Sequence, residues 1–244
     1  RVGEYRKIRF PGLSAYAQYQ VNRSRTQNNY ALWQTFLKLP SWEEALSRRN
    51  ELNFFPYFHL TEENGKWADN FLAENNLTGK KIIGIHPGSM AKNKYKRWSR
   101  EYFIALIEKL QESYPYPVLI IAGPDELEVG KAIQARTNTL ILQNALLENV
   151  AAVISRLHFF INTDSGLGHI ASCFGIKGLT IFGPANELQT APFSPNSYVI
   201  RYPVPCAPCR DKKKKPKCAL NCLIKLTPDM VFKRVQELLD WHCS

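Results

Sequence analysis

Short apolar segments alternate with amphipathic segments of helical spacing from residue 80 to residue 183. Apolar segments such as KIIGIH, PVLIIAG and LHFFINT are continuous, which is typical of parallel strands covered on both faces. The segments between them, such as SREYFIALIEKLQESY, repeat their apolar residues with the period of a helix. This order predicts right-handed β-α-β units on a parallel sheet, so we expect an α/β fold of the Rossmann-like, doubly wound class.

Capping residues indicate where several of the helices begin. Thr61 precedes the helical segment EENGKWADNFLAENNL, and Ser99 precedes REYFIALIEKLQESY. The side-chain oxygens of both residue types accept hydrogen bonds from the first turn of a helix. Pro228 is expected at the first position of a closing helix, where its missing N–H is not needed. Before residue 59 the pattern is less regular: YALWQTFLKL has helical spacing, and NFFPYFHL is extended.

The charge of the chain suits an anionic partner. Its 244 residues carry a formal net charge of +11, with a pI near 9.4. The partner could be a phosphate, a nucleic acid or an acidic membrane surface, and the charge does not choose among them. No apolar run reaches the length of a membrane span, and no signal peptide opens the chain. Because the first residue is Arg1 rather than Met, we expect a fragment or a chain whose beginning is missing.

Polar residues and glycines follow the ends of several predicted strands. In an open α/β sheet, ligands bind at the carboxyl ends of the strands. The sequence therefore predicts one polar rim built from several turns. The turns contain His86 to Ser89, Gly123 to Glu126, Thr163 to Gly166 with His169 one turn further, and Gly183 with Pro184.

The segment FINTDSGLGHIASCFG carries more polar groups than a strand-to-helix connection needs. Gly166 and Gly168 have no side chains to cover the first backbone N–H groups of the helix. Those groups are unpaired and carry the positive end of the helix dipole, so they can hold phosphate oxygens. This turn therefore suits a diphosphate.

Charged residues on two other turns would complete such a site. Glu126, near a helix start, would accept hydrogen bonds from ribose hydroxyls, as acidic residues do in dinucleotide folds. A cation on the loop after the first strand would neutralise a leaving group. The candidates on that loop are Lys92, Lys94, Lys96 and Arg97.

Each of these residues also has a purely structural interpretation. Asp164 or Ser165 can be an N-cap only, and His169 can be a core histidine. Glu126 can simply complement a helix dipole, and the lysines can lie on a solvated loop. Their shared position on one sheet edge favours the common site. The chain has no G-x-G-x-x-G after a strand and no G-x-x-x-x-G-K-[ST], so neither the usual dinucleotide fingerprint nor a P-loop is supported.

Several motifs, in this order, resemble those of glycosyltransferase family 9, the ADP-heptose:lipopolysaccharide heptosyltransferases and their relatives. The likeness runs from about Lys80 to about Leu239. RVGEYRKIRF also resembles the late part of the family's N-terminal domain. The motifs are IIGIHPGSMAKNKYKRWSREYFIALIEKL, LIIAGPDELE, INTDSGLGHIASCFG, LTIFGPANE, CAPC and CLIKLTPDMV.

The resemblance implies the C-terminal half of a GT-B fold, in which two Rossmann-like domains face each other across a cleft. We accordingly expect a truncated remnant of the N-terminal, acceptor-side domain over residues 1–60. Residues 61–227 would form the nucleotide-sugar-binding Rossmann-like domain. A C-terminal helix over 228–244 would close the chain and can cross back to the first domain.

The same resemblance implies roles in donor binding. By similarity, Ser89 would touch the donor's phosphate, Lys96 would meet the phosphate or the sugar, and Glu126 would hold the ribose. The residues that would surround the diphosphate and the sugar are Asp164, Ser165, Gly166, Leu167 and His169. The family's catalytic base belongs to the N-terminal domain, most of which is missing from this sequence, so the base is expected upstream and no catalytic residue is named.

The implied chemistry is inverting transfer of a heptose, or a related sugar, from a nucleotide donor such as ADP-heptose to lipopolysaccharide core. Lys96 and the amides after Asp164 would stabilise the charge on the leaving nucleoside diphosphate. The acceptor would be lipid-linked core oligosaccharide on the inner leaflet of a Gram-negative bacterium. The protein would be cytoplasmic and peripheral at the inner membrane, in contact with anionic lipid. Members of this fold generally need no metal for the chemistry.

Four of the six cysteines lie close together in the sequence. CAPCRDKKKKPKCALNC resembles a zinc knuckle, although its span is shorter than that of standard four-cysteine sites. A structural zinc site, free thiols and a disulfide formed on handling all stay open. The clustering is more typical of an intracellular metal or thiol site than of a secreted disulfide framework. The four residues are Cys206, Cys209, Cys218 and Cys222.

Three alternatives to the transferase stay open. A nucleotide-sugar epimerase or hydrolase can share the fold and would act without an acceptor. A basic, zinc-containing nucleic-acid-binding protein would use RDKKKKPK, but no aromatic residues interleave that stretch to stack on bases, so no nucleic acid is expected. Finally, this polypeptide can be a donor-binding part that is inactive alone, which is our expectation for the chain as given.

Overall fold

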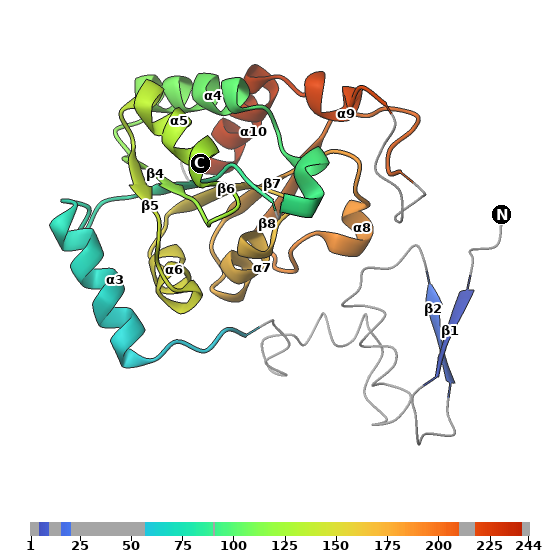
Figure 1. Ribbon diagram of the computed structural model, residues 1–244, viewed down its shortest axis with the longest axis horizontal. Helices are drawn as coiled ribbons and strands as arrows, with labels where there is room; N and C mark the ends of the chain where they lie inside the picture. The colour runs from blue at the N-terminus through green and yellow to red at the C-terminus, as the bar shows by residue number, and fades with distance from the viewer. Residues whose placement is uncertain (1–4, 10–15, 21–56, 90, 210–217, 241–244) are drawn as a thin grey trace.

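The computed structural model of the chain describes residues 5–9, 16–20, 57–89, 91–209 and 218–240 (Figure 1). The first two ranges are β1 (Tyr5–Arg9) and β2 (Tyr16–Gln20), which pair antiparallel. The helical pattern of YALWQTFLKL, the beginning of NFFPYFHL and the stretch RDKKKKPK lie outside the described residues. The other ranges form a Rossmann-like domain, which contains all the predicted site residues.

Six parallel strands form the central sheet of this domain, in the order β5-β4-β3-β6-β7-β8. The order changes direction between β3 and β6, which is the topological switch point of a doubly wound sheet. The predicted fold class is therefore confirmed. The strands are β3 (Ile83–His86), β4 (Val118–Ile121), β5 (Leu140–Leu142), β6 (Phe159–Thr163), β7 (Gly178–Phe182) and β8 (Ser197–Arg201).

Helices cover both faces of the sheet, as the continuous apolar strands predict (Figure 1). On one face lie α4 (Arg100–Ser113), α5 (Leu127–Thr137) and α10 (Pro228–Asp240). On the other face lie α3 (Glu62–Glu74), α6 (Leu147–Ile154) and α7 (Gly166–Cys173).

Successive residues of β4 contribute to two separate cores. Val118 and Ile120 pack with the cluster that contains α4 and α10, whereas Leu119 and Ile121 pack with the cluster that contains α3, α6 and α7. All four side chains are at most 4% exposed. This alternation follows from the strand period of two, and it explains why no polar residue interrupts the strand.

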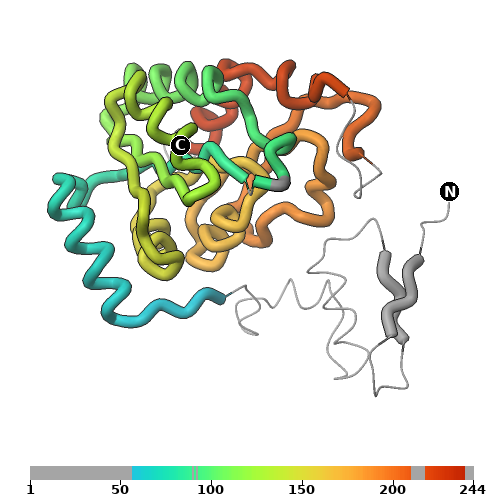
Figure 2. Tube along the Cα trace, in the orientation of Figure 1, coloured from blue at the N-terminus to red at the C-terminus, as the bar shows by residue number. Residues whose placement is uncertain are grey.

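The predicted helix starts are confirmed. The Thr61 side chain accepts a hydrogen bond from the Asn64 amide at 3.2 Å, and Ser99 Oγ accepts one from the Tyr102 amide at 3.1 Å. Pro228 is the first residue of α10. Figure 2 shows α10, in red, running beside α4, in green, and an ion pair of 2.8 Å joins Lys109 to Asp229 between these helices.

Three short helical segments are absent from the sequence-based expectations. They are η1 (Ala91–Lys96), a 3₁₀ segment in the loop after β3, α8 (Glu187–Thr190) after β7, and α9 (Asn221–Ile224) before α10. Each is too short to repeat an apolar face, so periodicity does not reveal it. Two of them, η1 and α8, contribute residues to the cavity described below.

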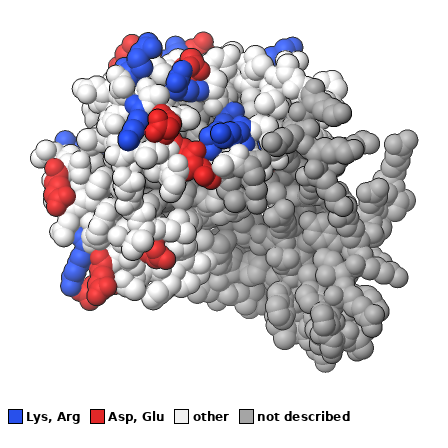
Figure 3. All heavy atoms as spheres, viewed as in Figure 1, with Lys and Arg blue, Asp and Glu red and all other residues white. Residues whose placement is uncertain are grey.

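The described helices include none that is long and apolar enough to cross a membrane. On the face drawn in Figure 3, the described lysine and arginine side chains are interspersed with aspartate and glutamate side chains. The excess positive charge of the chain is therefore not concentrated on this face of the described residues.

Candidate functional site

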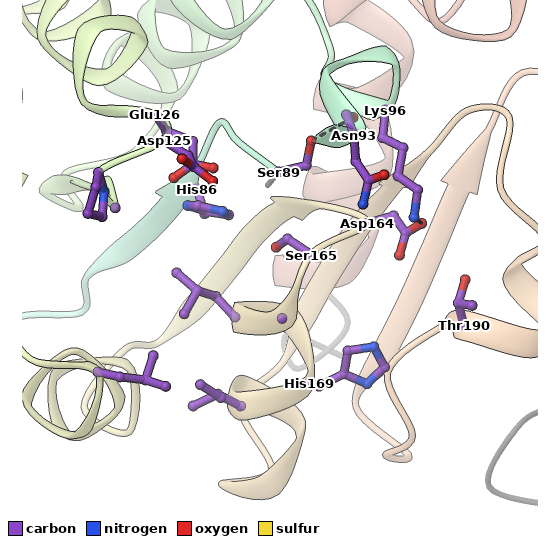
Figure 4. A pocket seen from close by; sticks show the side chains of 16 residues that line it. His86, Ser89, Asn93, Lys96, Asp125, Glu126, Asp164, Ser165, His169 and Thr190 are labelled. Atoms are coloured by element: carbon purple, nitrogen blue, oxygen red, sulfur yellow. Dashed lines mark hydrogen bonds and ion pairs between the residues drawn. The ribbon is translucent and has the colours of Figure 1, made fainter. Parts of the chain in front are cut away.

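A cavity of about 690 Å³ opens at the carboxyl ends of the strands, where the strand order changes direction between the neighbouring strands β3 and β6 (Figure 4). It is lined from several turns of the predicted rim together with η1, α6 and α8. The eight residues predicted for donor binding all line it, so the structure brings them together at one place. They are Ser89, Lys96, Glu126, Asp164, Ser165, Gly166, Leu167 and His169.

The turn from β6 into α7 presents a helix N-terminus to the cavity. Ser165 is the N-cap residue, yet its side chain makes no capping hydrogen bond, and its Oγ is buried without a hydrogen-bond partner among the described residues. A Cβ built on Gly166 would meet nothing within 4 Å, so the space beside the first turn of α7 is open. The turn therefore offers backbone N–H groups and a hydroxyl to an anion.

Gly168 serves a different purpose from the predicted one. A Cβ on Gly168 would lie 2.4 Å from Nδ2 of Asn162, a residue that is only 1% exposed. The Asn162 side chain donates to the Thr163 carbonyl at 2.6 Å and accepts from Thr180 Oγ1 at 3.2 Å. Gly168 therefore makes room for a buried, hydrogen-bonded asparagine, and it does not line the cavity.

Lys96 and Asp164 form an ion pair at the cavity wall. The Lys96 Nζ atom lies 2.5 Å from Asp164 Oδ2, and the two side chains are 19% and 8% exposed. Of the two residues that the structural interpretation names, Ser165 and not Asp164 occupies the N-cap position of α7. Among the lysines of the loop, Lys94 is exposed and does not line the cavity. The side chain of Lys92 lies outside the described residues.

Hydrogen bonds hold the loop after β3 in place. Ser89 is 2% exposed, and its Oγ donates to the Asn93 carbonyl at 2.9 Å. The Thr163 hydroxyl donates to the Gly88 carbonyl, which ties the end of β6 to the turn after β3. The two turns at the switch point are thus connected directly.

Glu126 is a buried carboxylate that lines the cavity from the turn between β4 and α5. It is 6% exposed, and Arg97 Nη2 lies 3.4 Å from its Oε1. Burial raises the pKa of Glu126, and the nearby Arg97 guanidinium opposes that rise. Gly88 makes the position possible, since a Cβ there would lie 1.7 Å from Glu126 Cγ. The side chain makes no capping hydrogen bond to α5, so helix capping does not explain it.

His86 also lines the cavity, at the end of β3. It is 4% exposed, its Nδ1 lies 2.8 Å from the Ile121 carbonyl, and burial lowers its pKa to about 4. The ring is therefore neutral near pH 7. Because a carbonyl oxygen only accepts hydrogen bonds, Nδ1 carries the proton, and Nε2 is an acceptor.

Sequence reasoning gave no role to several other lining residues. Asn93 and Thr190 come from η1 and α8, which have no periodic signal. Asp125 was part of the predicted rim, and its carboxylate accepts a hydrogen bond from the Ala91 amide at 2.8 Å. Leu147, on α6, carries no polar signal at all.

His169 is exposed at the cavity, so the alternative of a core histidine is wrong.

None of the four clustered cysteines lines this cavity. Cys206 and Cys218 are exposed, Cys209 is half-buried, Cys222 is buried, and all four are free thiols. Burial raises the pKa of Cys209 and of Cys222, and the neighbouring thiols raise it further. Within the described ranges, no group of three or more His, Cys, Asp or Glu side chains is arranged to hold a metal ion. A structural zinc site at these cysteines stays a prediction.

The fold and the cavity define a Rossmann-like domain with a cavity at the switch point of the sheet, which is the place where ligands bind in this class. Comparison with known families gives the narrower assignment. The chain belongs to glycosyltransferase family 9, the heptosyltransferases, whose family model matches residues 31–220. The membership expected from the motifs is thereby confirmed.

Curated relatives of the chain are heptosyltransferases. Lipooligosaccharide heptosyltransferase 2 of Campylobacter jejuni is 29% identical over 171 residues, which are 66% of this chain and 52% of the relative. Lipopolysaccharide heptosyltransferase 2 of Escherichia coli K12 is 27% identical over 167 residues, which are 65% of this chain and 47% of the relative. The chain spans about half the length of the curated relatives it matches.

Solved structures share the fold. The E. coli ADP-heptose LPS heptosyltransferase II matches with a TM-score of 0.60 and 21% identity, over 78% of this chain and 55% of that one. The E. coli heptosyltransferase WaaC, solved with ADP-2-deoxy-2-fluoro heptose, matches with a TM-score of 0.51 and 24% identity. That match covers 70% of this chain and 47% of WaaC.

Proposed function

We propose that the cavity binds the nucleoside diphosphate and the sugar of an ADP-heptose-type donor. The observation that carries this proposal is the ion pair of Lys96 with Asp164 beside the open N-terminus of α7. These groups match the chemistry of a sugar diphosphate. The cation can neutralise the phosphate charge, the carboxylate can accept hydrogen bonds from sugar hydroxyls, and the unpaired helix amides can donate to phosphate oxygens.

The phosphates would lie at the N-terminus of α7. The amides of its first turn and the Ser165 hydroxyl would donate to phosphate oxygens, and Lys96 would neutralise their charge. Asp164 would then exchange its bond with Lys96 for hydrogen bonds from sugar hydroxyls. The sugar would thus be placed next to the diphosphate that leaves from it.

The nucleoside would extend toward Glu126. A buried carboxylate kept near an arginine is a strong acceptor for ribose hydroxyls. The cavity volume of about 690 Å³ falls within the range of about 300–1,000 Å³ that is typical of small-molecule sites. Both ends of a nucleotide-sugar therefore have chemically suitable partners in one cavity.

The reaction that we propose is inverting transfer of heptose, or a related sugar, to lipopolysaccharide core. Family membership and the heptosyltransferase names of the relatives support it. Lys96 and the α7 amides would stabilise the negative charge of the departing diphosphate, which requires no metal. The base that deprotonates the acceptor hydroxyl would come from a part of the protein that precedes this domain. On its own, the chain would bind donor without transferring sugar.

The acceptor and the location follow from the same assignment. The acceptor would be lipid-linked core oligosaccharide, so the whole protein would work in the cytoplasm, at the surface of the inner membrane. The net charge of +11 favours contact with anionic lipid. Sedimentation of the protein with vesicles of anionic lipid, compared with neutral vesicles, would test that contact.

Calorimetric titration tests the donor site directly. ADP, ADP-heptose, UDP and GDP would be titrated into the chain and into Lys96→Ala, Asp164→Asn and Lys94→Ala. We expect adenine nucleotides to bind selectively. Lys96→Ala should weaken both ADP and ADP-heptose by about tenfold to a hundredfold, since a hydrogen bond to a charged group contributes about 1.5–3 kcal/mol. Asp164→Asn should weaken ADP-heptose relative to ADP, because Asp164 would contact the sugar.

The exposed Lys94 lies on the same segment and is the matched control, so Lys94→Ala should bind as the wild-type chain does. Equal affinity for ADP, UDP and GDP would contradict an adenine-specific donor. Failure of every nucleotide to bind, both to this chain and to the longer protein, would overturn the proposal. A transfer assay on both would test whether this chain alone is inactive.

A further inference from the structure

Arg97 lies directly after η1, behind the wall of the cavity rather than on its lining. Its side chain is 13% exposed, and two of its nitrogens donate to one acceptor, the Ser89 carbonyl, with Nε at 3.1 Å. Nη2 also donates to the Asp125 carbonyl at 3.0 Å and lies 3.4 Å from Glu126 Oε1. The guanidinium therefore joins two turns of the rim. It contacts the turn after β3 through the Ser89 carbonyl, and the turn after β4 through the Asp125 carbonyl and the Glu126 carboxylate.

These contacts fasten the loop after β3 onto the turn after β4. A second connection runs beside them, because Asp125 Oδ2 accepts from the Ala91 amide at 2.8 Å. The Ser89 carbonyl accepts from the guanidinium and fixes its position. The lack of a side chain at Gly88 leaves space for the Glu126 side chain. The position of Glu126 thus depends on a residue that itself does not reach the cavity.

We propose that Arg97 is a positioning residue that aims the Glu126 carboxylate into the cavity, where the carboxylate would accept hydrogen bonds from a ribose. This inference rests on the proposed nucleotide site and adds to it the residue on which the nucleoside end depends. Lysine cannot replace it, because a single ammonium lacks the planar fork that spans the Ser89 carbonyl, the Asp125 carbonyl and the carboxylate.

The groups around Glu126 predict the direction in which its pKa shifts when Arg97 is replaced. Burial raises the pKa of Glu126, Arg97 lowers it, and Asp125 raises it. From β3, His86 faces the same wall, but it is neutral near pH 7 and adds no charge there. Removing the Arg97 charge takes away the largest influence that favours the ionised form of Glu126, and only the smaller effects of the backbone hydrogen bonds at Gly123 and Glu126 still lower its pKa.

The test uses Arg97→Met, Arg97→Lys and the control Arg100→Met. The Arg100 side chain is 52% exposed and pairs with Glu101. Carbon-13 NMR of the side-chain carboxyls gives the pKa of Glu126 without any ligand, and Glu126→Gln identifies its signal. ADP and inorganic pyrophosphate are then titrated at several pH values. Thermal unfolding of each variant shows whether it is folded at the temperature of the titration.

We expect the pKa of Glu126 to rise in Arg97→Met and, by less, in Arg97→Lys, whose ammonium keeps the charge but not the geometry. ADP affinity should fall about tenfold at neutral pH, the equivalent of about 1.4 kcal/mol. The pH below which ADP binding is lost should move upward. Pyrophosphate, which has no ribose, should bind as before, and Arg100→Met should change nothing.

Three results would overturn the inference. They are an unchanged Glu126 pKa in Arg97→Met, an equal loss of ADP and pyrophosphate affinity, or a full rescue of ADP binding by Arg97→Lys. If Arg97→Met does not fold, the pKa and the ADP to pyrophosphate ratio of Arg97→Lys decide the question. If the wild-type chain binds no nucleotide at all, the proposed function fails, whereas the NMR measurement still tests the effect of Arg97 on Glu126.

Discussion

The Lys96 ammonium lies 2.5 Å from the Asp164 carboxylate, which joins η1 to the turn between β6 and α7 at the wall of the cavity. Both side chains are largely shielded from water. Without a ligand, each charge neutralises the other. A donor would therefore have to replace this interaction rather than fill a site of free charges.

This pair should be visible in the stability of the protein. Lys96→Met and Asp164→Asn should each lower the free energy of unfolding by about 1–2 kcal/mol, because each leaves a partly buried partner without its counter-ion. The double variant should lose less than the sum of the two. Urea unfolding of the four proteins gives the coupling. The exposed pair of Glu62 and Lys66 is the control, with an expected coupling below about 0.5 kcal/mol. A strictly additive double variant would contradict this view of the pair.

Two glycines of α7 should differ in how well they tolerate replacement by alanine. Gly168→Ala should destabilise the protein by about 1–3 kcal/mol, because the new methyl group would lie against the amide of Asn162. Gly166→Ala should not destabilise it, since the position is open and alanine favours a helix. Thermal and urea unfolding of both variants provides the measurement, and equal losses would show that Gly168 has no special packing role.

His86 should make the protein less stable in mild acid. Its folded pKa of about 4 lies below the ordinary value of 6.5, so the unfolded chain binds more protons between these two values. Its contribution to stability is therefore complete above about pH 6.5 and is lost as the pH falls toward 4, by up to about 3 kcal/mol.

The pH dependence is measured by urea unfolding from pH 7.5 to pH 4 in wild type, His86→Asn and the control His59→Gln. His59 is exposed on the surface. The His86→Asn curve should be flatter than the wild-type curve, whereas the control should run parallel to it. Glu126 acts with the opposite sign because its pKa is raised, and the comparison of variants removes its effect. Parallel curves for all three proteins would contradict the role of His86.

Two serines at helix starts should separate capping from ligand binding. Ser99→Ala should lower the free energy of unfolding by about 1 kcal/mol, because Ser99 Oγ accepts from the Tyr102 amide at 3.1 Å. Ser165→Ala should cost little or even stabilise, since it removes a buried hydroxyl that has no hydrogen-bond partner among the described residues. The same Ser165→Ala variant should weaken ADP binding in a calorimetric titration. A Ser165 variant that unfolds early and still binds ADP normally would contradict the assignment.

The sequence predicts the sheet well, because burial on both faces leaves a strong signal. β4 and β6 are continuous apolar runs, and Thr61 and Ser99 begin their helices as expected. The rim also follows from the sequence, since the carboxyl ends of parallel strands meet at one edge of the sheet. Lys96 required the family resemblance, because Lys92, Lys94 and Lys96 are alike in local sequence.

Other parts of the site depend on contacts that no local pattern records. Asn93 lines the cavity because η1 folds the loop back, and that segment is too short for an apolar face. The exclusion of a side chain at Gly168 comes from Asn162 on the preceding strand. Arg97 meets Glu126 only because β3 and β4 are neighbours in the sheet. These relationships belong to tertiary structure, so they could not be predicted from the sequence.

The strand order has a consequence for the time course of folding. β3 and β6 lie side by side, but β4, β5, the 3₁₀ segment η1 and three α-helices separate them along the chain. The walls of the cavity therefore meet only after this long-range pairing has formed, which is slower than local contacts. A nucleotide added during refolding would bind only to molecules in which β3 and β6 are already paired. The rate at which nucleotide binding appears would therefore report the rate at which the sheet is completed.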